Sequence, residues 1–144
     1  MQRNRAVDAI PALINPIFVG PSDSRATYLA DDNTVLGLLI NGEAKDYPHN
    51  IGWSHEITND PVDGRSIVVS FCPLTRTGMV FDAGKSGNRM FLGVSGNLFN
   101  NNLVMYDRKD DLSNATLYPQ MLGFGISGAR QGEELPLIPV VETT

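Results

Sequence analysis

Hydrophobic residues along this chain gather in short runs that alternate with turn-forming residues. Three of these runs, 35–40, 66–72 and 103–106, are rich in large aliphatic and aromatic side chains. Short apolar runs bounded by Gly, Pro, Asn and Asp are typical of buried strands, whereas an amphipathic helix needs apolar positions three and four residues apart. Because such runs recur at a spacing of about ten residues, the pattern predicts a β-dominated fold.

The turn signals predict how neighbouring strands connect. Asn41-Gly42 follows the run 35–40 and is a strong hairpin signal, because both residues tolerate a positive φ. A second hairpin is predicted with its turn at 82–88. Residues 59–64 are predicted to be a loop, because they hold Asn, Asp, Pro and Gly. Residues 49–54 are predicted to form a helical turn.

Prolines interrupt both ends of the chain. Two of them break the apolar stretch 8–20, so a long helix is excluded there. Residues 23–29 are predicted to form a short helix capped by Ser22. The apolar tail 135–141 is broken in the same way, which predicts an edge strand or an extended arm that packs on another surface.

Together these elements predict one mainly β (β-dominated α+β) domain over residues 1–144. It consists of short antiparallel strands, with short helical turns near the N-terminus. The length suits a single domain that buries its own core. The two ends, 1–8 and 135–144, are predicted to be extended or flexible arms.

Composition and charge exclude several classes of protein. The formal net charge is −5 and the basic residues form no stripe, so no nucleic-acid partner is expected. No apolar run reaches the length of about 18 residues that a membrane-spanning helix needs. A single cysteine excludes an internal disulfide.

Candidate chemistry collects in residues 53–78, which hold the only Trp, the only Cys and one of the two His. We predict that His55, Glu56 and Cys72 share a pocket, with the Cys72 thiol at the rim of a sheet where its strand ends. Successive side chains on a strand face opposite ways, so His55 and Glu56 would diverge unless a bulge redirects one of them. Asn59 stands where a metalloprotease helix needs its second His, so that signature is excluded.

Further polar residues are candidates to line the same pocket, because they offer amide, hydroxyl, carboxylate or guanidinium groups. They are Asn59, Asp60, Arg76, Thr77, Ser95 and Gln120. Arg76 would favour the thiolate form of Cys72. In the alternative interpretation these residues cap turns and satisfy buried backbone groups.

Several motifs follow one another along the chain in a fixed order. They are Asn15-Pro16, 35–48, His55-Glu56-Ile57, Asn59-Asp60, Cys72-Pro73-Leu74, Thr77-Gly78, 94–98, 103–108, Gln120 and Gly128. In this order they resemble a widespread prokaryotic family catalogued as a domain of unknown function. The chain departs from the family at Ser54 and Tyr118, where members usually carry Trp, and at Thr75, where many carry a second Cys.

The resemblance implies a site at the motif residues but no settled activity. Members of the family commonly look exported. The resemblance therefore implies an extracytoplasmic protein, periplasmic or secreted, whose leader is absent from this chain.

Two hypotheses for the function follow. In the first, Cys72 and His55 bind a transition metal such as Zn or Cu, with His49 as a weaker candidate ligand, or His55 acts as the base for a Cys72 nucleophile. In the second, the domain is a non-catalytic binding or assembly module whose motif residues are structural. The tail 135–141 would then pair with another subunit and produce a homo-oligomer.

Overall fold

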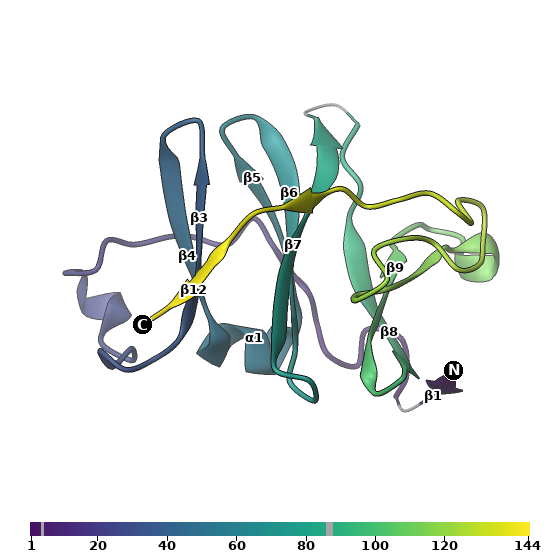
Figure 1. Cartoon of the computed structure of the whole chain (residues 1–144), viewed down its shortest axis with the longest axis horizontal. Coiled ribbons are helices and arrows are strands. Elements are labelled where there is room, and N and C mark those ends of the chain that lie inside the picture. The colour runs from purple at the N-terminus through teal and green to yellow at the C-terminus, as the bar shows by residue number, and fades with distance from the viewer. Residues whose placement is uncertain (4, 86–87) are drawn as a thin grey trace.

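The computed structural model describes residues 1–3, 5–85 and 88–144. The fold is mainly β with one short α-helix, as the sequence predicts (Figure 1). The strands are β1 (Gln2–Arg3), β2 (Leu13–Ile14), β3 (Val35–Ile40), β4 (Glu43–Pro48), β5 (Ile57–Val62), β6 (Arg65–Cys72), β7 (Thr77–Lys85), β8 (Leu92–Phe99), β9 (Asn102–Asp107), β10 (Leu117–Pro119), β11 (Leu137–Ile138) and β12 (Val141–Thr143). The helical elements are α1 (His49–His55) and the 3-10 turns η1 (Ser24–Ala26) and η2 (Leu112–Asn114).

The described strands form three sheets that follow one another along the long axis of the molecule (Figure 1). The central sheet has the order β11-β7-β6-β5-β2. It lies between the β3–β4 sheet, ordered β12-β3-β4, and the β8–β9 sheet, ordered β1-β8-β9-β10. Neighbouring strands of the described chain are antiparallel, apart from the parallel pair β2 and β5.

Both faces of the central sheet are buried, which explains the nearly continuous apolar run in β6. Val68 and Cys72 face a core shared with the β8–β9 sheet. Ile67 and Val69, the alternate residues, face a second core shared with the β3–β4 sheet. A strand covered on one face alternates apolar and polar residues, whereas a strand covered on both faces needs apolar residues throughout.

The predicted hairpin and helical turn between residues 35 and 55 are both present. Asn41 and Gly42 join β3 to β4 with φ values of 48° and 91°. Helix α1 begins directly after Pro48, whose extended backbone starts it. The helix packs closely on the central sheet at Gly52, where an added Cβ would lie 2.8 Å from the Cβ of Phe71.

The structure corrects the prediction of a loop at 59–64. β5 continues as a strand to Val62, and only Asp63 and Gly64 form the turn to β6. Asn59 and Asp60 are turn-forming residues by local preference, but here they are buried and hydrogen-bonded to other strands. Tertiary contacts therefore outweigh the local preference.

Two smaller predictions near turns are also wrong. The segment 82–88 does not join a hairpin, because β7 pairs with β6 and β11, whereas β8 pairs with β1 and β9; Ser86 and Gly87 lie outside the described residues. The short helix near residue 24 is capped by Asp23 rather than by Ser22, since the Asp23 Oδ1 accepts from the Arg25 N–H at 2.9 Å.

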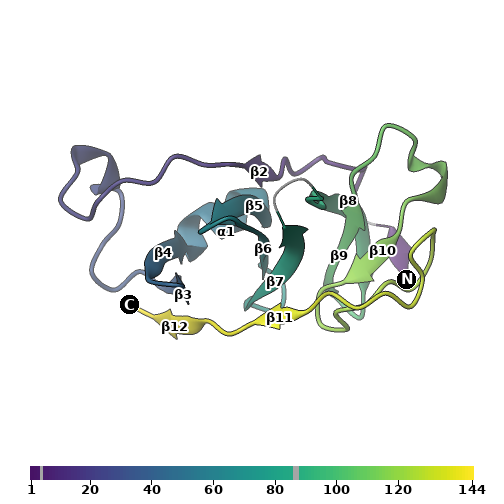
Figure 2. The same cartoon turned by 90° about the horizontal axis from the view of Figure 1, so that it is seen from above.

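The two ends of the chain run along opposite sides of the sheets (Figure 2). Residues 13–29, which we call the N-terminal strap, pass over one side. The C-terminal arm, residues 135–144, passes over the other and pairs within its own chain, as β11 with β7 and β12 with β3. No helix in the described ranges is long and apolar enough to cross a membrane.

Candidate functional site

Asn59 connects the central sheet to the β8–β9 sheet. Its Nδ2 donates to the carbonyl of Leu92 at 2.9 Å, and its Oδ1 accepts from the N–H of Leu92 at 2.8 Å. A longer bond of 3.3 Å joins Nδ2 to the carbonyl of Leu13. Because Asn59 is only 1% exposed, its amide satisfies backbone groups that water does not reach.

Asp60, the next residue, connects the central sheet to the β3–β4 sheet. Its buried Oδ2 accepts from Lys45 Nζ at 2.7 Å and from the Tyr47 hydroxyl at 2.8 Å. Burial, followed by the charge of Asp60, raises the pKa of Tyr47, so the phenol keeps its proton as a donor. Lys45 Nζ also donates to the carbonyl of Pro61 and lies 4.6 Å from the ring centre of Phe18.

Gln120 forms a second connection between the central sheet and the β8–β9 sheet. Its Nε2 donates to Ser70 Oγ at 3.0 Å and to the carbonyl of Thr77 at 2.9 Å. Its Oε1 accepts from Asn102 Nδ2 at 2.8 Å. Thr77 therefore contributes its backbone to this network, while its hydroxyl donates to the carbonyl of Thr75.

The thiol of Cys72 lies in the core between the same two sheets. β6 ends at this residue, as predicted, but Cys72 is 1% exposed and packs among apolar side chains. The Sγ atom is 3.9 Å from the carbonyl of Asn101, in the turn between β8 and β9. The strand end is therefore not an open rim, because the neighbouring turn covers it.

His55 closes α1 and is held by the N-terminal segment. Its Nδ1 lies 2.8 Å from the carbonyl of Pro11. Among the contacts of the described residues, none joins the side chains of His55 and Cys72. The structure thus places each of the two predicted partners against a different segment.

Glu56 joins α1 to β5 in an unusual backbone conformation, with φ 58° and ψ −33°. Its N–H ends the helix by donating to the carbonyl of Gly52 at 2.8 Å. Residues other than glycine are strained at a positive φ of this kind, and such strain is found disproportionately at functional sites. Burial raises the pKa of the Glu56 carboxyl, and the charge of Arg5 lowers it by a smaller amount.

Ser95 and Arg76 lie apart from each other. Ser95 is buried at a register shift in β8, where its hydroxyl donates to the carbonyl of Val104 at 2.6 Å. Arg76 has a φ of 50° in the turn after β6 and borders a surface hollow together with His49 and Trp53. The predicted site residues are therefore spread over several locations.

The described part of the chain contains no cluster of metal-ligating side chains. Within that part, no three His, Cys, Asp or Glu side chains lie close enough together to hold an ion. Metal binding by Cys72 and His55 stays a prediction that rests on their residue types.

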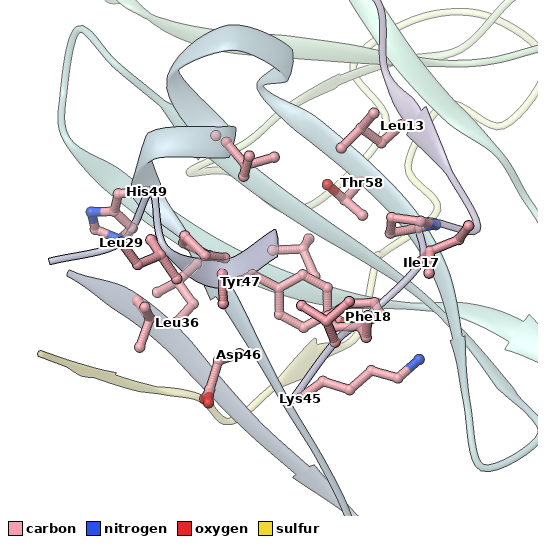
Figure 3. A pocket seen from close by; sticks show the side chains of 18 of the residues that line it. Leu13, Ile17, Phe18, Leu29, Leu36, Lys45, Asp46, Tyr47, His49 and Thr58 are labelled. Carbon is pink, nitrogen blue, oxygen red and sulfur yellow. The ribbon is translucent and has the colours of Figure 1, made fainter. Parts of the chain in front are cut away.

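A cavity of about 690 Å³ lies between the N-terminal strap and the sheets (Figure 3). Figure 3 shows Phe18 and Leu29 of the strap around the same space as Tyr47 and Thr58 of the sheets. Most of its lining is apolar or aromatic. It comes from the strap, α1, the central sheet and the β3–β4 sheet. Prominent lining residues are Leu13, Ile17, Phe18, Tyr28, Leu29, Leu36, Tyr47, Ile51, Val69 and Phe71.

Among the predicted site residues of the described chain, Glu56 lines this cavity, and so does His49, the weaker candidate ligand. Sequence reasoning missed Phe18, Lys45 and Tyr47, which form one wall. A signal for them was present in the strap, where large apolar residues stand in a proline-broken segment that cannot bury them in a regular element of its own. Such residues need a surface to cover.

Comparison with known proteins identifies the family. The family model described as "Protein of unknown function (DUF3179)" matches residues 7–144. The chain belongs to this family. Searches among curated proteins and among solved structures gave no match. The match confirms the resemblance predicted from the order of the motifs, and because the family's description states no activity, the function has to be argued from the geometry of this member.

Proposed function

We propose that this member of the family is a non-catalytic binding module, which holds a small and largely apolar ligand between its N-terminal strap and its sheets. The observation that carries the proposal is the cavity of about 690 Å³. Small-molecule sites in proteins commonly enclose about 300–1,000 Å³ and are lined mainly by apolar and aromatic side chains with a few polar groups. The cavity has this size and this kind of lining.

The contacts of the motif residues support a binding role rather than a catalytic one. Asn59, Asp60 and Gln120 use their polar atoms for hydrogen bonds between sheets. Asp60 joins the central sheet to β4, both of which border the cavity, whereas Asn59 and Gln120 join the central sheet to the β8–β9 sheet, so these polar atoms are occupied in holding the sheets together. Of the two hypotheses derived from the sequence, this geometry favours the second.

The thiol- or metal-centred hypothesis stays a separate prediction, as does the extracytoplasmic location. Self-assembly through the C-terminal arm is a prediction too. Light scattering over a range of concentrations tests it, and a strict monomer would count against it. None of these is needed for the cavity to bind a ligand.

A neutral apolar dye tests the proposed binding role. N-phenyl-1-naphthylamine fluoresces strongly in apolar surroundings, so its emission should rise saturably on addition of the protein. Ala26 lines the cavity from the strap, so Ala26→Trp should place an indole in the ligand's volume and weaken binding by about tenfold. Ala30 is an exposed residue outside the lining, so Ala30→Trp is the matched control and should bind like the wild type.

The melting temperatures of both variants are measured alongside the dye titrations. The proposed function is wrong if the wild type does not bind the dye. It is equally wrong if both folded tryptophan variants bind the dye as well as the wild type does.

A further inference from the structure

We infer that the ligand of this cavity is a small amphipathic cation, whose apolar body fills the space under the strap and whose ammonium group lies beside Glu56. This inference rests on the proposed binding function and adds the charge of the ligand. It follows from the ionised groups on the cavity wall and from the partners that each of them already has.

Lys45, the lysine among the described lining residues, already has three oxygen partners. Lys45 Nζ lies 2.7 Å from Asp60 Oδ2, 2.8 Å from the carbonyl of Pro61 and 3.5 Å from Glu43 Oε1. The first two contacts are hydrogen bonds and the third is a longer ion pair, so Asp60 and Glu43 already offset the charge of Lys45. A carboxylate or phosphate on a ligand would have to compete with these partners for Lys45.

The carboxylates of the wall exceed its cations. Glu43 and Glu56 line the cavity, and Asp60 lies behind Lys45, whereas the Asp46 carboxylate points away from Tyr47 (Figure 3). Lys45 offsets one of the three charges on the cavity side, and Arg5, outside the lining, partly offsets that of Glu56, which leaves an excess of negative charge there. An anionic ligand would meet this excess without a free partner, whereas a cation would offset it.

Glu56 is the carboxylate best placed to receive a cation. The structure gives its side chain no hydrogen bond or ion pair among the described residues, and Arg5 acts on it only as a more distant charge. The carboxyl is half-buried, so a ligand cation would replace solvation that the group has partly lost.

Aromatic rings form part of the cavity wall. The Phe71 N–H donates to the Glu56 carbonyl at 2.7 Å and both residues line the cavity, while the Phe71 ring packs on α1, 4.5 Å from the centre of the His49 ring. Elsewhere on the wall, Lys45 Nζ already lies 4.6 Å from the ring centre of Phe18. The face of an aromatic ring attracts a cation at this range, so the Phe18 ring already stabilises one positive charge, that of Lys45, at the cavity wall.

Three probes that share one apolar body test the charge preference. They are 4-phenylbutylamine, 4-phenylbutanol and 4-phenylbutyrate, which are cationic, neutral and anionic at pH 7. Titrations are followed by amide chemical shifts, and the responding residues should include Thr58, Val69 and Phe71 on the cavity floor. The amine should bind about fivefold to tenfold more tightly than the alcohol, and the carboxylate more weakly than both. Raising the salt concentration should reduce the difference.

Glu56→Gln should lower the affinity for the amine to that for the alcohol and leave the alcohol unchanged. Glu134→Gln is the matched control, because it removes the same charge from an exposed residue outside the cavity lining. It should leave the preference for the amine intact. Melting curves establish that both variants fold.

The inference is overturned if the wild type binds the alcohol or the carboxylate as tightly as the amine, or if the preference for the amine survives in Glu56→Gln. It is also overturned if the neutral dye binds in the cavity while none of the three probes does. These results leave the proposed binding function standing. Failure of the dye to bind would instead overturn both.

Discussion

Removal of the Asn59 side chain should destabilise the fold strongly, because this amide serves as a strand partner for β8. Leu92 of β8 lies opposite Asp107 of β9, and the N–H of Arg108 donates to the carbonyl of Phe91. In an antiparallel ladder this makes Leu92 and Asp107 a pair without mutual hydrogen bonds, so the N–H and C=O of Leu92 point away from β9. Those two groups are the ones that the Asn59 amide meets, at 2.8 and 2.9 Å. Asn59→Ala leaves both of them without a partner.

The expected loss follows from the number of groups left unpaired. Leu92 is 0% exposed, so water does not replace the amide without rearrangement. An unsatisfied buried donor or acceptor costs about 1–3 kcal/mol, so two of them set an upper range of about 2–6 kcal/mol. Since local relaxation recovers a part of this, we expect a loss of about 2–4 kcal/mol, which is a large fraction of the 5–15 kcal/mol typical of a domain.

Urea unfolding at pH 7, followed by circular dichroism, measures this loss. The midpoint should fall while the slope with urea stays near its wild-type value. Asn114→Ala is the matched control, because Asn114 is exposed and its side chain makes no hydrogen bond in the described structure. It should change the free energy of unfolding by no more than about 0.5 kcal/mol. A loss of less than about 0.5 kcal/mol for Asn59→Ala would refute the structural role.

Three further outcomes are expected. Because Cys72 is 1% exposed, its thiol should react with Ellman's reagent only as the protein unfolds; rapid labelling of the native protein, lost in His55→Ala, would support the thiol-site hypothesis instead. Burial raises the pKa of Glu56, so the stability that its proton provides is present below about pH 4 and is lost as the pH rises through the folded-state value. Glu56→Gln should therefore be more stable than the wild type at pH 7 and equal to it near pH 4 in urea titrations, and equal stabilities at both pH values would contradict this reasoning. Gly78→Ala would bring a methyl group within 2.5 Å of Leu36 Cδ1 and should lower the free energy of unfolding by about 1–3 kcal/mol, with no change expected if Leu36 can move aside freely.

Local patterns in the sequence predicted the elements whose neighbours lie close along the chain. The Asn41-Gly42 hairpin and the β6 strand are examples, because a turn type and a run of apolar residues specify them. The family, too, could be recognised from the order of short motifs. These features depend on residues that are adjacent or nearly so.

Features that depend on distant partners could not be predicted in the same way. Asn59 and Asp60 look like turn residues until Leu92 and Lys45 are placed beside them. The depth of Cys72 depends on the turn at Asn101, which comes much later in the chain. The cavity likewise arises where the irregular strap crosses two sheets, and no local pattern encodes that crossing.

The neighbouring residues Asn59 and Asp60 also fix the alignment of β5. Their side chains point to opposite faces of the sheet. Asn59 meets the N–H and C=O of Leu92, whereas Asp60 meets the ammonium of Lys45 and the phenol of Tyr47. A slip of β5 by one residue in one direction would bring the carboxylate to the Leu92 carbonyl, and a slip in the other direction would bring the amide to Lys45. The first contact is repulsive and the second leaves a buried cation without its counter-ion. Two adjacent polar side chains thereby exclude a shifted pairing that the apolar residues of β5 and β6, buried on both faces, would tolerate.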